Sequence, residues 1–147
     1  MATTTFLSNA TINITQGATT YDLSDQANTC VLTIGQDALE STAFGDTGRK
    51  FVGGLQSVEV AITFFLSYGG SGSTSEVETA LAAIVGQGNT TLVISPSGTT
   101  ESASNPEYTI TNAMLASFTP INSTVGELAT VEVSFTGGTW ARDITTP

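Results

Sequence analysis

The stretch at residues 55–66, LQSVEVAITFFL, decides the fold class, because apolar and polar residues alternate along most of its length. Such alternation is typical of a β-strand with one face in a core and the other towards solvent. Five apolar side chains share the predicted core face: Val58, Val60, Ile62, Phe64 and Leu66.

Alternating stretches also occur at residues 108–118 and 129–136, on either side of a turn that contains Pro120. This pair predicts a long antiparallel hairpin. Shorter strands are expected at 11–15, 28–34 and 90–95. Together they indicate a mainly β protein, an antiparallel β-sandwich or barrel-like fold.

A single flanking α-helix is predicted at about residues 76–85. Ser75 and Glu78 have the spacing of a capping box, which marks a helix start. The apolar residues Val77, Leu81 and Ile84 recur at helical spacing, which predicts that this face packs on a sheet.

The 147 residues fit one domain, 1–147, with an N-terminal arm at about 1–10 and a C-terminal tail at about 139–147. A long loop is expected at about residues 36–53, where glycines are frequent and the alternation is lost. Loops of this length in a compact domain are usually functional or mobile. Trp140 in the tail either binds a partner subunit or covers the edge of the core.

The charge balance excludes several function classes. The chain has 13 acidic residues, three basic ones and no histidine, for a net charge of −10. Without histidine there is no Ser-His-Asp triad and no common zinc site. Specific nucleic-acid binding needs many cationic contacts to phosphates. We therefore predict a protein that is not an enzyme, with no catalytic residues, no metal and no cofactor.

Two smaller signals have ordinary explanations. Asp22 and Asp25 could bind calcium, but they lack the spacing of a calcium loop and fit a solvated turn. Cys30 lies in an apolar run and fits a buried thiol. No apolar run approaches the ~18–20 residues of a membrane span, so no membrane association is expected.

The string ESTAFGDTGRKFVGGL at residues 40–55 resembles a block of long-tailed bacteriophage major tail proteins, the tail tube family. The order of elements after it, a long alternating strand, a helix, a strand ending at Pro96 and a closing hairpin, is also similar. The resemblance covers about residues 20–138.

This resemblance implies a structural virion protein that self-assembles into hexameric rings, which stack into the tube that delivers DNA to the host. The implied location is the virion tail, assembled in the host cytoplasm. The implied partners are copies of the chain and the tail terminator, tail-tip and tape-measure proteins. DNA would pass through the lumen without specific binding.

The resemblance also implies site residues. The 36–53 loop would contact the adjacent ring, where Arg49 and Lys50 would meet an acidic surface. Its predicted contact residues are Phe44, Asp46, Arg49, Lys50 and Phe51. The predicted lumen-facing residues are Glu59, Thr63, Thr130, Glu132 and Ser134, although an ordinary solvated face explains them equally well.

Two other functions remain open at this point. The chain could be a different virion β-protein, such as a capsid decoration or tail-tip subunit. Less in keeping with the sequence is a carbohydrate-binding adhesive β-sandwich, because sugar-binding surfaces usually present exposed aromatic rings and Trp140 is the sole tryptophan.

Overall fold

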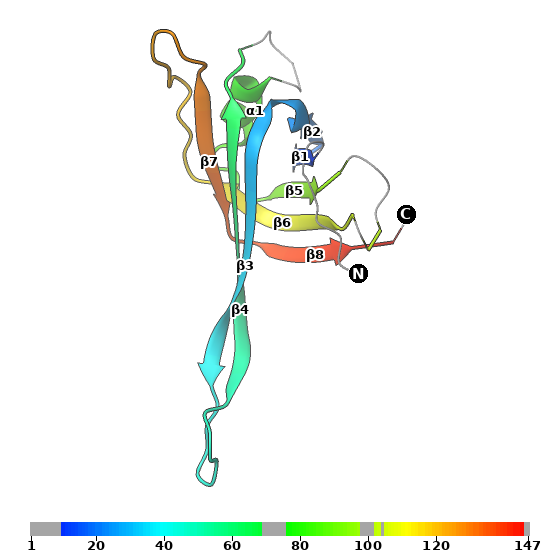
Figure 1. Cartoon of the computed structure of the whole chain (residues 1–147), viewed down its shortest axis with the longest axis vertical. Helices are drawn as coiled ribbons and strands as arrows, with labels where there is room; N and C mark the ends of the chain where they lie inside the picture. Colours follow the sequence, from blue (N-terminus) through cyan, green and yellow to red (C-terminus); the bar gives the residue numbers. More distant parts are fainter. Residues whose placement is uncertain (1–9, 69–75, 98–101, 104, 146–147) are drawn as a thin grey trace.

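One antiparallel sheet of eight strands, which does not close on itself, organises the part of the chain that the structure describes (Figure 1). The structure is a computed structural model, and it describes residues 10–68, 76–97, 102–103 and 105–145. The elements are β1 (Thr11–Gln16), β2 (Thr19–Asp22), a 3-10 turn (Ser24–Gln26), β3 (Ala27–Glu40), β4 (Phe51–Phe65), α1 (Val77–Ile84), β5 (Thr90–Ser95), β6 (Glu107–Leu115), β7 (Thr130–Thr136) and β8 (Thr139–Asp143).

The strands lie in the order β2-β1-β5-β6-β7-β4-β3, and β8 also pairs with β6. Several neighbours are far apart in the chain: Thr11 pairs with Ser95, and Glu59 pairs with Thr136. The mainly β, antiparallel fold with a flanking helix is confirmed.

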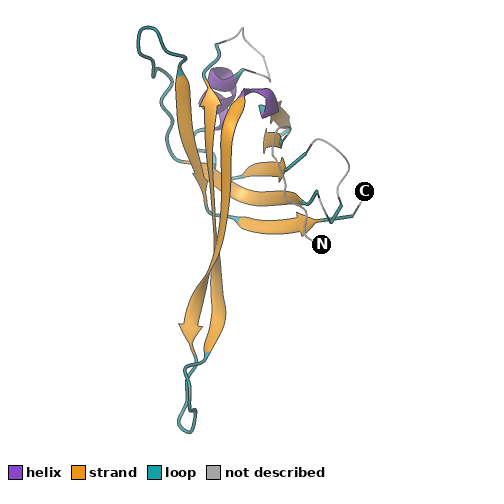
Figure 2. Ribbon diagram, in the orientation of Figure 1, coloured by secondary structure: helices purple, strands orange, loops and turns teal. Residues whose placement is uncertain are grey.

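The sheet bends sharply where β6 passes from β8 to β7. Thr111 pairs with Thr139 and Met114 pairs with Thr136, so the register is continuous and places Asn112 opposite Gly138. Asn112 has φ 64°, and Gly138 has φ 87°. These left-handed conformations turn the chain, and Figure 2 shows β6 and β8 running at a steep angle to β7, β4 and β3.

The core fills the space inside this bend. The alternating face predicted from residues 55–66 is largely buried. Val58, Val60, Ile62 and Phe64 are at most 3% exposed, and Leu66 is partly buried against the core. The opposite wall comes from β1, β5 and β6. The largest fully buried side chains include Phe64, Phe135, Ile14, Leu92 and Ile110.

Helix α1 packs its apolar stripe on this core, as predicted. Val77, Leu81 and Ile84 are completely buried. Ser75 of the predicted capping box lies outside the described residues. Ser67 caps the first turn. Its Oγ accepts a hydrogen bond from the Val77 N–H at 3.0 Å, and its carbonyl accepts one from the Glu78 N–H at 3.1 Å.

The loop expected at 36–53 is strand at both of its ends, which is a correction. β3 continues to Glu40 and β4 begins at Phe51, so the connection is only residues 41–50. A register irregularity between Gln36 and Ala38 interrupts the alternation. Gly53 allows a close approach there, because a Cβ at this position would lie 2.5 Å from Gln36 Nε2.

The C-terminal tail expected at 139–147 is also partly a strand. β8 covers Thr139–Asp143 and pairs with the first half of β6. Trp140 packs against the core, with its ring centroid 6.3 Å from that of Tyr108. It therefore covers the core edge, one of the two roles expected for it. Of the N-terminal arm at 1–10, residues 1–9 lie outside the described residues.

Candidate assembly surfaces

The most prominent feature outside the core is the arm, which we define as residues 36–56. It contains the ends of β3 and β4 with their connection and projects well beyond the rest of the molecule (Figure 1). Almost every residue in it is exposed. Since nothing in the described part of the same molecule covers it, its conformation depends on local hydrogen bonds.

The tip of the arm is held by a network around Asp46. Its Oδ2 accepts a hydrogen bond from the Ala43 N–H at 2.8 Å, and its Oδ1 lies 2.7 Å from Nζ of Lys50. The Lys50 interaction, then the Ala43 N–H, lowers the pKa of the Asp46 carboxyl. In a second contact, the Lys50 backbone N–H donates a hydrogen bond of 3.0 Å to Oγ1 of Thr42. These contacts order the connection and leave Phe44 at its apex.

The predicted inter-ring residues all lie on this arm, and the structure assigns them different positions. Phe44 is fully exposed at the tip, and Phe51 begins β4. Asp46 and Lys50 are paired with each other. Arg49 is exposed and forms no ion pair with any described residue. Of the two cations, Arg49 is therefore the one left for another molecule.

Sequence reasoning identified Phe51 on the arm but missed Leu39 and Val52 beside it. Leu39 pairs with Val52 and, one position further, Glu40 pairs with Phe51. Successive positions point to opposite faces of a strand pair, so apolar side chains lie on both faces of the arm. Leu39, Phe51 and Val52 are each more than half exposed. The sequence feature that could have identified these residues is that they are apolar within an otherwise polar segment.

The predicted lumen residues share one exposed surface, the polar face, formed by the outer sides of β3, β4 and β7. Pairing places Thr63 opposite Glu132 and Ala61 opposite Ser134. Thr130 lies at the end of the same face, opposite Phe65. Glu132 and Ser134 are exposed, whereas Thr63 and Thr130 are half-buried.

Glu59 is also exposed on this face, and its neighbours on both sides are threonines that the sequence reasoning did not single out. Thr33 pairs with it from β3, and Thr136 pairs with it from β7. β3, β4 and β7 contain no lysine or arginine. Hydroxyl groups and uncompensated carboxylates therefore dominate this face, which gives it a negative potential.

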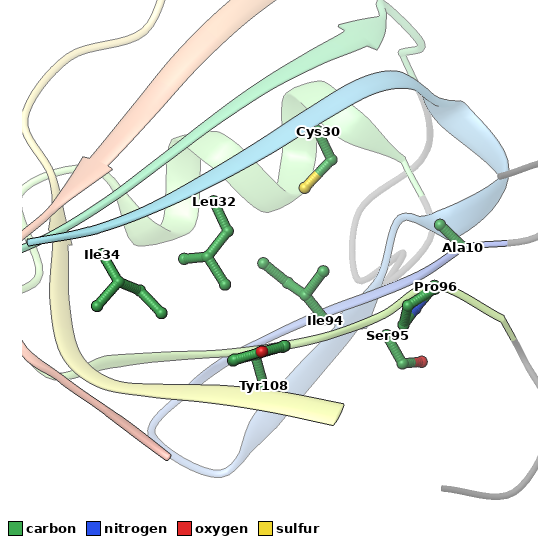
Figure 3. Close-up of a pocket in the computed structure, with 8 residues that line it drawn as sticks. All are labelled: Ala10, Cys30, Leu32, Ile34, Ile94, Ser95, Pro96 and Tyr108. Atoms are coloured by element: carbon green, nitrogen blue, oxygen red, sulfur yellow. The ribbon is translucent and has the colours of Figure 1, made fainter. Parts of the chain in front are cut away.

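An apolar cleft lies on the inner side of β3, where the open sheet leaves the core uncovered (Figure 3). Its volume is about 330 Å³, and β3 contributes Cys30, Leu32 and Ile34. Burial raises the pKa of the Cys30 thiol to about 11. The opposite wall contains Ile94 and Tyr108. The described residues that line the cleft are mainly apolar, with Ser95 and Tyr108 as exceptions, so few polar groups could orient a small ligand.

The chemistry of the described residues is otherwise simple. Asp22 Oδ1 accepts hydrogen bonds from the N–H and Oγ of Ser24, at 3.2 and 2.7 Å, which makes it part of a local turn. Within the ranges that the structure describes, no group of three or more potential metal ligands occurs. No described helix is both long and apolar enough to cross a membrane.

Solved structures with the same fold come from tailed particles and injection systems. A chain of the sheath/tube terminator of an extracellular contractile injection system, PVC, is 14% identical with a TM-score of 0.62, and the match covers 97% of this chain and 98% of that one. A chain of the PVC sheath–tube complex is 11% identical with a TM-score of 0.59, covering 93% and 89%. A chain of the native gene transfer agent virion is 9% identical with a TM-score of 0.61, covering 90% and 95%.

At these identities the likeness shows a shared fold that spans almost the whole chain. It agrees with the tail-tube-like resemblance of the sequence at the level of the fold. No family model matches the sequence, and no curated protein matches it either.

Proposed function

We propose that this chain is a structural subunit of a phage-like tail, and that it forms hexameric rings that stack into the tail tube. The arm is the observation that carries this proposal. It projects from the body, exposes Phe44 at its tip and presents apolar side chains such as Leu39 and Phe51 on both faces. Exposed apolar surface of this kind marks contacts with other proteins.

The unpaired edge of β3 supports assembly from a second direction. β3 has 14 residues and, among the described residues, pairs only with β4, so its other edge offers backbone N–H and C=O groups to a further strand. A long open edge is a template for pairing between molecules. Subunits that join at this edge would extend the β3–β4–β7 part of the sheet around a ring.

In such a ring the polar face would line the lumen. Glu59 and Glu132, with the hydroxyl groups around them, would repel DNA phosphates, whereas lysines or arginines would bind them. DNA would then pass to the host without specific binding. The solved structures support the tube only through the shared fold, and the six-fold number comes from the family resemblance.

The proposed role fits a non-enzymatic virion protein whose partners are other tail components: the tail terminator, tail-tip and tape-measure proteins. Assembly would take place in the host cytoplasm and the product would be part of the virion tail. Cofactors have no role in this function.

Negative-stain electron microscopy of the purified protein tests the proposal. Hollow tubes or six-fold rings are expected, and their number should increase with protein concentration. The Phe44→Ala variant should keep its fold, because this side chain is fully exposed, but should form shorter tubes. Protein that stays monomeric at high concentration would refute the proposal.

A tube-terminating subunit is the second candidate, because one of the similar chains comes from a sheath/tube terminator. The same experiment separates the two roles. A terminator should form single rings that do not stack, whereas a tube subunit should polymerise.

A further inference from the structure

Two β-turns at opposite ends of the molecule have the same form. The tip turn, residues 43–46 (AFGD), lies at the end of the arm. The far turn, residues 124–127 (TVGE), lies in the connection between β6 and β7 (Figure 1). Each is closed by an N–H···O=C bond of 3.1 Å between its fourth and first residues. Each has glycine third, with φ 95° at Gly45 and 87° at Gly126, as a type II turn requires.

Both turns present a fully exposed apolar residue at the second position. Phe44 is 110% exposed and Val125 is 102% exposed. Near Val125, Ile121 and Leu128 are also largely exposed. These three apolar side chains form what we call the far patch. Several exposed apolar side chains within one short segment are typical of a docking surface.

The far patch belongs to a connection that is held to the body at several points. Tyr68 Oη donates a 2.6 Å hydrogen bond to the carbonyl of Pro120. Asn122 Nδ2 donates one of 2.8 Å to the carbonyl of Thr130. The Leu66 N–H donates one of 2.9 Å to the carbonyl of Ala129. Little further ordering would be needed on binding, which favours association.

The charges at the two ends are opposite. Residues 41–50 contain Asp46, Arg49 and Lys50, a net charge of +1 in a chain of −10. Residues 116–129 contain Glu127 and no basic residue, a net charge of −1. Asp46 is paired with Lys50, while neither Arg49 nor Glu127 forms an ion pair with a described residue. Complementary charges of this kind set the orientation and register of a contact.

We propose that the far patch is the surface that receives the arm tip of a second copy, with Phe44 packed among the apolar side chains and Arg49 paired with Glu127. This contact rests on the proposed function and specifies it, because it joins the lower end of one subunit to the upper end of another. Head-to-tail contacts between different surfaces generate open, repeating assemblies.

A charge exchange tests the pair. Arg49→Glu and Glu127→Arg, each alone, should reduce the fraction of protein that sediments as tubes and leave single rings. The double variant should restore sedimentation. The matched control combines Arg49→Glu with Glu132→Arg, which reverses an exposed carboxylate on the polar face, and this combination should not restore tubes.

A crosslinking experiment tests the contact without requiring tubes. In a Cys30→Ser background, subunits with Phe44→Cys are mixed with subunits carrying Val125→Cys and oxidised. A disulfide-linked dimer that requires both variants is expected. A mixture of Phe44→Cys with Glu132→Cys is the control and should give no such dimer.

The outcomes separate the two proposals. Two results would refute the far-patch contact and leave the proposed tube intact. In the first, the wild type forms tubes and Glu127→Arg sediments normally. In the second, the wild type forms tubes and only Glu132→Arg restores the tubes lost in Arg49→Glu. Absence of the crosslink would overturn the far patch in the same way. Wild-type protein that forms neither rings nor tubes, without the crosslink, would overturn both.

Discussion

Adjacent glycines at the bend of the sheet give a prediction whose size follows from the structure. Gly137 and Gly138 have nearly equal φ values, 85° and 87°. An L-residue in this region costs roughly 1–2 kcal/mol. A Cβ on Gly137 would have nothing within 4 Å, whereas on Gly138 it would lie 3.0 Å from the carbonyl carbon of Asn112 and closer still to the carbonyl oxygen of Thr111.

Gly137→Ala should therefore lower the unfolding free energy only by the cost of holding an alanine in the left-handed conformation, about 1–2 kcal/mol. Gly138→Ala should lose this and a further ~1–3 kcal/mol, the usual cost of overpacking, because backbone atoms of β6 cannot rotate away. The total of about 2–5 kcal/mol is a large part of the 5–15 kcal/mol typical of a domain.

Urea unfolding followed by circular dichroism measures both variants against the wild type. The midpoint should fall more for Gly138→Ala than for Gly137→Ala, and the slope of the transition should not change. Equal losses, or a larger loss at Gly137, would refute the argument that the close approach of β6 requires glycine at position 138.

Three further predictions concern single side chains. Phe135→Ala should lower the unfolding free energy by about 3–5 kcal/mol, because Phe135 is 1% exposed; Phe44→Ala should change it by less than about 0.5 kcal/mol in the same urea experiment. The Asp46 carboxyl should titrate below its ordinary pKa of 3.8, because Lys50 stabilises its charged form. The contacts of Asp46 that order the arm tip should therefore be kept above pH 3.8 and lost as the pH falls through the lowered pKa. NMR titration checks this, and Lys50→Met should raise the midpoint. Burial raises the Cys30 pKa from 9.0 to about 11, so a disulfide reagent at pH 8 should react about 100-fold more slowly in the native protein than in urea, and equal rates would contradict that burial.

The sequence predicts best those elements whose pattern depends only on local alternation. The core face of β4 and the stripe of α1 are in this class, because Ile62 and Leu81 recur at the spacing of their element. The register irregularity near Gln36 explains the failure in the arm, since one additional residue on β4 destroys the alternation while the hydrogen-bonded pairing continues.

The candidate surfaces were predictable in part. Glu59 and Glu132 were placed on one face of their strands by alternation, and the pairing of β4 with β7 then brings the two strands side by side. The pairing of Lys50 with Asp46, which separates the roles of the two neighbouring cations, depends on the geometry of the tip. The cap that Ser67 provides for α1 also depends on tertiary structure, because it acts across ten residues.

The pairing of Glu59 with Thr136 has a consequence for the order in which the protein is made. β3 and β4 emerge from the ribosome early, but β7 is complete only when residue 136 has been synthesised. Pairings between residues this distant in the chain form late and slowly. The surface proposed to line the channel is therefore complete only after β7 has been synthesised, well after β3 and β4. An incomplete nascent chain lacks it, which would keep truncated subunits out of a growing tube.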